Sequence, residues 1–323
     1  MTIFKGLRAC IVTTLVLMSC FPVAAQTLTV VLTFDDLPLA AGQGPAGTQK
    51  NPVEAQRVNG ALLGALKKHH APAIGFVNGK TVEELGSDKG KQILRQWTQE
   101  GFDLGNHTFS HADLNNITLE QFQQEVATGE DSFRQMLAEA GKTPRYLRFP
   151  YNHTGETKEK HDSAALFLKQ RGYQIAACTI DNEDYLFDAA YVQMLARTDD
   201  GSAAKLRAEY LAYTAVEIDY YASLHKQLFG REIPQVMLLH ANLLNADVID
   251  KILGIFEEKH YRFVSLETAQ SDPAYRVPDT FVSKFGPMWA YRWAKELGIK
   301  VDGSLESEPP AWITQYGQEP VKQ

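Results

Sequence analysis

Two hydrophobic patterns alternate along the chain and predict its regular elements. Short β-rich runs recur at residues 28–34, 73–77, 102–105, 145–149, 173–179, 234–239 and 261–265. Most are separated by segments with helical spacing of apolar residues, at residues 53–70, 90–100, 118–140, 162–171 and 245–260. Strand–helix alternation of this kind indicates βαβ units and an α/β fold with a parallel sheet of about seven strands. Periodicity alone leaves open whether the sheet closes into a barrel or stays doubly wound.

One internal segment and the C-terminal tail depart from this alternation. Residues 187–230 carry no strand pattern and are rich in Ala, Leu and Tyr, which predicts a helical hairpin inserted between two units of the sheet. The main domain would then run over residues 26–270. Residues 271–323 form a C-terminal extension that holds Trp289, Trp293 and Trp312. We expect the helical part of this extension, residues 288–297, to pack on the main domain, because buried aromatic residues are usually core.

The first 25 residues have the pattern of a secretory signal peptide. Lys5 and Arg8 precede an apolar run over residues 10–19, and the small residues of the segment 23–25 follow it. That order is typical of a cleaved export signal, so we expect a periplasmic or secreted protein with no integral membrane segment in the mature chain. Cys20 offers an alternative, because the residues before it loosely resemble a lipoprotein cleavage box.

Composition narrows the classes of partner. The chain has 323 residues, 44% hydrophobic and 22% charged, as in ordinary globular proteins. A formal net charge of −7 argues against a nucleic-acid partner. Cleavage after residue 25 would leave Cys178 as the single thiol, and its apolar surroundings predict a buried residue. His225 and three other histidines, at positions 69, 70 and 260, lie in polar helical contexts and are expected at the surface.

The residues with chemical potential follow predicted strands, at the sheet edge where α/β proteins build their sites. Asp35 and Asp36 end the first strand. Within a regular strand they would face opposite sides, but at a fraying end both can turn toward one site. A solvated turn is the alternative, because Asp-Asp-Leu-Pro is also good turn chemistry.

A second group follows the third strand. His107 and His111 are four residues apart, which would place both imidazoles on one face of a helical turn, a spacing suited to zinc. Together with Asp36 they make a set of two histidines and one carboxylate, which leaves coordination positions open for water and substrate.

Three further groups follow later strands. Arg148 could hold a neighbouring carboxylate ionised, and the Tyr151 amide after Pro150 could point at a developing oxyanion. The segment Asp181-Asn182-Glu183-Asp184-Tyr185 follows the fifth strand. His240 ends the sixth, where a histidine with a carboxylate behind it can act as a general acid.

In chain order, these groups resemble the five motifs of the polysaccharide deacetylase family, also called the NodB-homology domain or carbohydrate esterase family 4. The motifs read TFDD, HTFSH, RFPY, DNEDY and LLH, and the resemblance extends from about residue 27 to about residue 268. It implies a distorted (β/α) barrel with a metal ion, usually zinc, in its mouth.

The resemblance also implies a role for each residue. Asp36, His107 and His111 would bind the metal. Asp35 would be the general base, held by Arg148, and the Tyr151 amide would stabilise the oxyanion. His240 would be the general acid, tuned by Asp184.

The sequence departs from the family pattern in three places: Tyr185 replaces a tryptophan, Asn152-His153 follows Tyr151 where glycine is common, and the 187–230 insertion is long. The leading hypothesis is a hydrolase that removes N-acetyl groups from N-acetylglucosamine units of peptidoglycan or a chitin-like polysaccharide. An O-acetyl xylan esterase, an amidase on a smaller molecule, and a non-catalytic glycan-binding protein are the alternatives.

Overall fold

A computed structural model describes residues 27–40 and 51–318. Its sheet has seven strands, all paired in parallel: β1 Thr29–Leu37, β2 Ala73–Val77, β3 Asp103–Asn106, β4 Tyr146–Leu147, β5 Gln174–Ile175, β6 Gln235–His240 and β7 Arg262–Phe263. Their order is β5-β4-β3-β2-β1-β6, with β7 paired to the start of β1. The predicted strand positions and the parallel sheet are confirmed.

The sheet closes into a distorted barrel through the segment that follows β5. Ile180 forms a parallel bridge to Met237 of β6. The Thr179 amide donates to the Val236 carbonyl at 2.9 Å, and the Leu238 amide donates to the Ile180 carbonyl at 2.9 Å. The chain therefore pairs first with β4 and then with β6, which joins the two ends of the sheet. This closure decides the question that periodicity left open, and the predicted barrel is confirmed.

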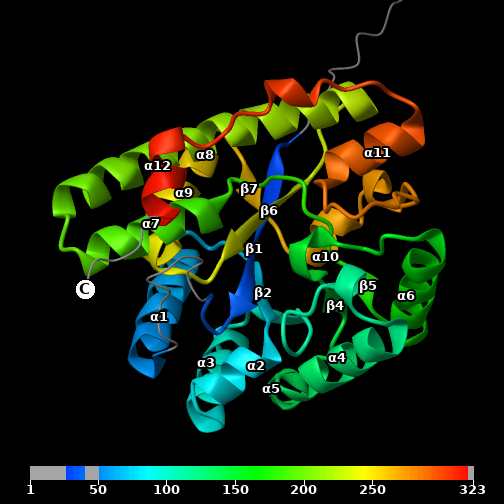
Figure 1. Ribbon diagram of the computed structural model, residues 1–323, viewed down its shortest axis with the longest axis horizontal. Helices are drawn as coiled ribbons and strands as arrows, with labels where there is room; N and C mark the ends of the chain where they lie inside the picture. The colour runs from blue at the N-terminus through cyan, green and yellow to red at the C-terminus, as the bar shows by residue number, and fades with distance from the viewer. Residues whose placement is uncertain (1–26, 41–50, 319–323) are drawn as a thin grey trace, which may run out of the picture.

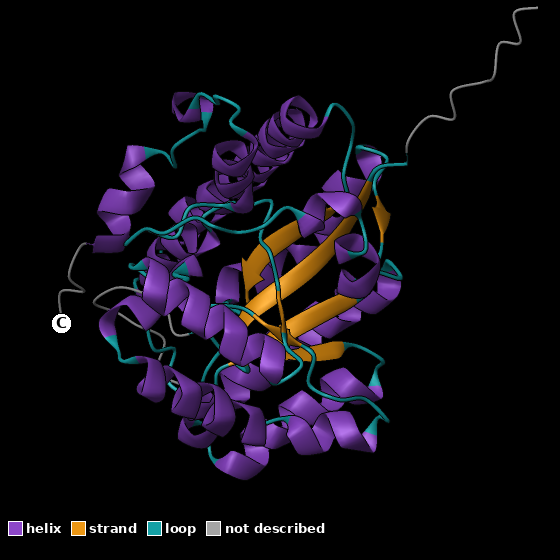
Figure 2. Ribbon diagram, turned by 90° about the vertical axis from the view of Figure 1, so that its right-hand side faces the viewer, coloured by secondary structure: helices purple, strands orange, loops and turns teal. Residues whose placement is uncertain are grey.

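Helices surround the sheet (Figure 2). They are α1 Pro52–Lys68, α2 Gly79–Glu84, α3 Ser87–Gln99, α4 Leu119–Asp131, α5 Arg134–Glu139, α6 Lys158–Gln170, α7 Asp184–Ala196, α8 Asp200–Phe229, α9 Leu243–Glu258, α10 Leu266–Gln270, α11 Trp289–Leu297 and α12 Ala311–Gln318. The side chains of Asn51 and Thr118 cap α1 and α4, and Thr118 forms a capping box with Gln121. Such caps satisfy amide groups that a helix leaves unpaired at its start.

The long helix predicted over residues 118–140 is wrong in one respect, because it is two helices. Phe133 leaves the helical conformation with φ −134° and is completely buried, so α4 ends at Asp131 and α5 begins at Arg134. Burial of this aromatic ring in the core outweighs the continuity of the helix.

The predicted helical insertion is present as α7 and α8. The two helices form an antiparallel pair beside the barrel, and the 30-residue α8 runs along one side of the molecule (Figure 1). The hairpin begins at Asp184, so it grows directly out of the fourth motif.

The C-terminal extension lies against this insertion. Helix α11 packs on α8, and α12 crosses α7 (Figure 1). Trp289, Trp293 and Ile313 are buried in the same apolar cluster as the barrel strands, whereas Trp312 is only half-buried. Cys178 is completely buried, as predicted, and burial raises the pKa of its thiol to about 12.

The predicted signal peptide, including Cys20, lies outside the described residues. Over residues 27–40 and 51–318, no helix combines the length and hydrophobicity needed to cross a membrane.

Candidate active site

A cavity of about 510 Å³ opens at the carboxyl ends of the strands. Six of the eight residues proposed from the sequence line it: Asp35, Asp36, His107, His111, Tyr151 and His240. The other two, Arg148 and Asp184, are completely buried behind Asp35 and His240. The structure thus brings all eight together.

A bulge in β1 turns the two adjacent carboxylates toward this cavity. The pairing of β1 with β2 shifts register between Phe34 and Leu37, and Asp36 adopts a left-handed conformation with φ 61°. Asp35 keeps regular pairing with β6, where it lies opposite His240. An extra residue in one strand re-aims side chains in this way, which explains how neighbours in a strand can share a site.

Asp36, His107 and His111 form the one cluster in the described ranges that could hold a metal ion. Their ligand atoms all lie within 4.8 Å of one another. The Asp36 Oδ1 is 3.8 Å from the Nε2 of each histidine. The predicted helical turn for His107 and His111 is wrong: residues 107–111 form an irregular loop in which Thr108 and His111 have φ values of 64° and 57°.

The chemistry of this cluster fits a divalent metal. The His107 Nδ1 lies 2.9 Å from the Arg148 carbonyl, an acceptor that requires a proton on Nδ1 and leaves the Nε2 lone pair toward Asp36. Asp36 Oδ1 is buried and has no hydrogen-bond partner in the described structure, as expected of a ligand atom.

Electrostatics favour the metal-binding forms of Asp36 and His111. Burial raises the pKa of Asp36, but His111, His107 and His240 outweigh it, and the net shift is downward. Burial is the main influence on His111 and lowers its pKa. An ionised carboxylate and a neutral imidazole are the ligand forms that a metal requires.

Asp35 is clamped on its buried side. Its Oδ1 accepts a hydrogen bond from Arg148 Nη1 at 2.9 Å, and the same nitrogen donates to Thr33 Oγ1 at 2.5 Å. Arg148 also lies over the Phe76 ring, 4.5 Å from its centroid. Asp35 is 3% exposed, and this charged hydrogen-bond partner compensates for its burial and orients the carboxylate.

His240 is held by Asp184. The His240 Nδ1 is 2.6 Å from Asp184 Oδ1, and the His240 amide donates to Oδ2 at 2.7 Å. Burial lowers the pKa of His240, but Asp184 more than compensates and raises it to about 10. The imidazole is therefore protonated at neutral pH and offers its Nε2 proton to the cavity.

Residues that sequence reasoning missed complete the support of Asp184. Asn242 Nδ2 donates to Asp184 Oδ2 at 3.0 Å, and Asn245 makes a short bond to the same oxygen. Tyr210 of α8 donates to Asn245 at 2.7 Å, so the insertion buttresses this carboxylate. No periodicity marks these residues, because their role arises only when α8 and α9 pack beside β6.

The fourth motif, the insertion and the extension each supply further carboxyl groups to the cavity wall. Asp181, Glu183, Asp188 and Glu306 line it. Burial raises the pKa of Asp181 to about 6, that of Asp188 to about 7 and that of Glu183 to about 8.

Comparisons with known proteins show which family this chain resembles. Residues 24–176 match the family described as polysaccharide deacetylase. The chain is 25% identical over 124 residues to the peptidoglycan-N-acetylglucosamine deacetylase of Bacillus cereus, covering 38% of this chain and 40% of that protein. It is 31% identical over 125 residues to the chitooligosaccharide deacetylase of a Bradyrhizobium species, covering 39% and 47%. The matched segment thus spans less than half the length of either relative.

A solved structure shares the fold. The polysaccharide deacetylase Bc1974 from Bacillus cereus superposes with a TM-score of 0.51 at 19% identity, covering 74% of this chain and 92% of that one. The resemblance to the polysaccharide deacetylase family inferred from the motifs is confirmed. The fourth and fifth motifs lie beyond residue 176, outside the segment matched to the family.

Proposed function

We propose that this protein is a metal-dependent hydrolase that removes N-acetyl groups from N-acetylglucosamine units of a polysaccharide. The observation that carries the proposal is that the adjacent carboxylates Asp35 and Asp36 have different surroundings, which suit different roles. Asp35 is tied to Arg148, whereas Asp36 leaves a buried oxygen facing two histidines. A glycan-binding protein would need neither this pair nor a buried His240–Asp184 couple.

Asp36, His107 and His111 would hold the metal, and zinc is the proposed ion because two imidazoles and one carboxylate suit it. Such an ion, when bound, lowers the pKa of water and polarises a carbonyl. Asp35 accepts the proton of the attacking water. The Tyr151 amide donates to the oxygen that gains charge, and His240 protonates the departing amine.

The substrate class is proposed from the relatives, whose names specify peptidoglycan N-acetylglucosamine units and chitooligosaccharides. An exported protein would meet glycans of this kind. Residues 1–25 carry the export prediction, and their processing is checked by N-terminal sequencing of the mature protein; a lipid on Cys20 would appear as an added mass.

The decisive experiment measures acetate release from chitooligomers and peptidoglycan, with metal-free protein and with protein reloaded with zinc. We expect release only after reloading. The matched variant Asp35→Asn should lose at least about 100-fold in kcat, since general acid–base catalysis contributes that much. Its zinc content should stay stoichiometric, because Asp35 is not among the proposed ligands.

Each other outcome has a distinct meaning. Zinc binding without release from either glycan, but with release from acetylated xylan or a small amide, would replace the proposal with an ester or small-amide hydrolase. Retained glycan binding with no hydrolysis of any substrate would favour a binding protein.

A further inference from the structure

The turn that carries Tyr151 is strained. Tyr151 and Asn152 both adopt left-handed backbone conformations, with φ values of 58° and 54°. Neither is glycine, and each left-handed residue costs about 1–2 kcal/mol. Such strain persists only where surrounding contacts hold it. Asn152 is 8% exposed, so those contacts come from the protein.

The contacts come from the C-terminal extension, mainly from Arg292 of α11. Its Nη2 donates to the Asn152 carbonyl at 2.6 Å, and its Nη1 donates to Thr154 Oγ1 at 2.9 Å. The opposite side is fixed as well, because Nε donates to the Pro287 carbonyl and Nη1 to Asp279 Oδ2, both at 2.9 Å. Arg292 is 2% exposed.

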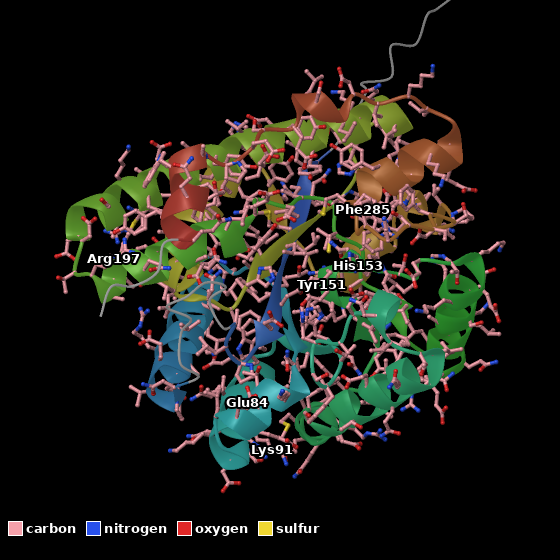
Figure 3. All side chains as sticks on the ribbon, viewed as in Figure 1. Glu84, Lys91, Tyr151, His153, Arg197 and Phe285 are labelled. Carbon is pink, nitrogen blue, oxygen red and sulfur yellow. The ribbon has the colours of Figure 1, made fainter. Side chains whose placement is uncertain are left out.

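Gly286 of the extension also packs closely against this turn. A Cβ added at Gly286 would lie 1.8 Å from the Tyr151 carbonyl oxygen and 2.9 Å from the Asn152 carbonyl carbon. Figure 3 labels Tyr151 below Phe285, the residue before this glycine. On its inner side the Tyr151 ring packs edge-to-face with His111, with ring centroids 4.6 Å apart. The turn therefore packs against the extension on one side and against His111, a proposed metal ligand, on the other.

We propose that Arg292 is a positioning residue for the reaction: it holds the Tyr151–Asn152 turn so that the Tyr151 amide faces the reacting carbonyl. This inference rests on the proposed function. The hydrogen bonds of Arg292 go to residues outside the proposed catalytic and metal-binding set, and Arg292 lies far beyond the segment matched to the family. The planar guanidinium of Arg292 donates several hydrogen bonds in fixed directions, and the single ammonium group of a lysine cannot reproduce that geometry.

The test compares Arg292→Met and Arg292→Lys with Arg231→Met as the matched control. Arg231 makes a bidentate ion pair with Asp272, at 2.8 and 2.5 Å. This pair also joins the main domain to the C-terminal extension, but it does not contact the Tyr151–Asn152 turn. In zinc-loaded protein, Arg292→Met should lower kcat about 100-fold, the loss typical of a 1 Å misplacement. KM should change less than about 3-fold, and Arg292→Lys should recover only part of kcat.

Two measurements separate positioning from general damage. Hydrogen exchange of a peptide spanning residues 149–155 should speed up in Arg292→Met and not in Arg231→Met, while zinc stoichiometry stays unchanged in both. Gly286→Ala should reproduce the loss of kcat with Arg292 intact, which covers the case in which Arg292→Met fails to fold.

Equal kcat losses in Arg292→Met and Arg231→Met, or unaltered exchange of residues 149–155, would overturn the proposal. Wild-type protein that releases no acetate would instead refute the proposed function, and the exchange comparison would still report whether Arg292 holds the turn.

Discussion

The His240–Asp184 pair shows most directly how a buried partner can set the pKa of a residue in this site. Asp184 raises the pKa of His240 to about 10 against the effect of burial. A general acid works only while protonated, so in its proposed role His240 would stay competent through neutral and mildly alkaline pH.

Replacing Asp184 by Asn should therefore move the alkaline limb of the kcat/KM profile to lower pH. The expected displacement is about 1–3 pH units, the effect of removing one nearby opposite charge. The measurement is acetate release across pH 6–11 in zinc-loaded protein. A limb that stays in place would show that another group sets it.

The position of His225 differs from the one predicted from the sequence. Its polar neighbours in the sequence predict a surface position, but it is completely buried in α8 between Tyr221 and Trp293. The reason is that α11 covers this face of α8, which no local pattern reveals.

Burial lowers the pKa of His225 to about 3, from 6.5 in the unfolded chain. The unfolded state therefore gains a proton first as pH falls, and stability present above pH 6.5 is lost between pH 6.5 and 3. In His225→Gln, the stability difference between pH 7 and pH 5 should shrink by about 2 kcal/mol. Urea unfolding at both pH values measures it, and the exposed His70→Gln serves as control. An unchanged difference in His225→Gln would contradict the buried neutral imidazole.

Whole elements position the irregular loops. The strands and most helices could be predicted from periodicity, because burial of one face imposes a regular spacing on the sequence. The loop of His107 to His111 could not: its spacing matched a helix, yet its path depends on α4 packing against it. A Cβ added at Gly129 of α4 would lie 2.8 Å from the Thr108 carbonyl carbon and 3.0 Å from the Phe109 nitrogen.

Gly129→Ala should therefore push this loop and weaken zinc binding by about 10–100-fold, the usual cost of disturbing the support of metal ligands. Competition with a chelator of known affinity measures the change. Gly60→Ala in α1 is the matched control, because nothing lies within 4 Å of its added methyl group. That control should keep zinc affinity and gain about 1 kcal/mol of stability. Equal zinc affinity in both variants would show that α4 does not set the loop.

At the scale of the whole molecule, the extension shares the barrel's core. Trp293 is 1% exposed and belongs to the same apolar cluster as β1 and β6. The sequence indicated that the tail would pack, but not that it would hold Tyr151, because only the closed fold brings Arg292 to that turn.

Trp293→Ala should cost about 3–5 kcal/mol, as for other large-to-small changes in a core. Because the cluster is continuous, far-UV circular dichroism and intrinsic fluorescence should report one shared, lowered melting transition. Trp312→Ala, at a half-buried position, should cost less. Two separate transitions in the wild-type protein would show instead that the extension folds as an independent unit.

The left-handed residues around the cavity have a consequence for laboratory evolution. Asp36, Thr108, His111, Tyr151, Asn152 and Glu183 all have positive φ values and lie in or beside the motifs. Two features of Thr108 destabilise the folded state. It is a β-branched residue with a positive φ, and its buried hydroxyl has no hydrogen-bond partner in the described structure. A library selected only for survival of heating should drift toward glycine at Thr108, since glycine adopts this conformation without steric cost. Selection that also demands acetate release should keep Asp36 and His111. Selection for thermal stability and selection for activity would therefore favour different residues within this small set of left-handed positions.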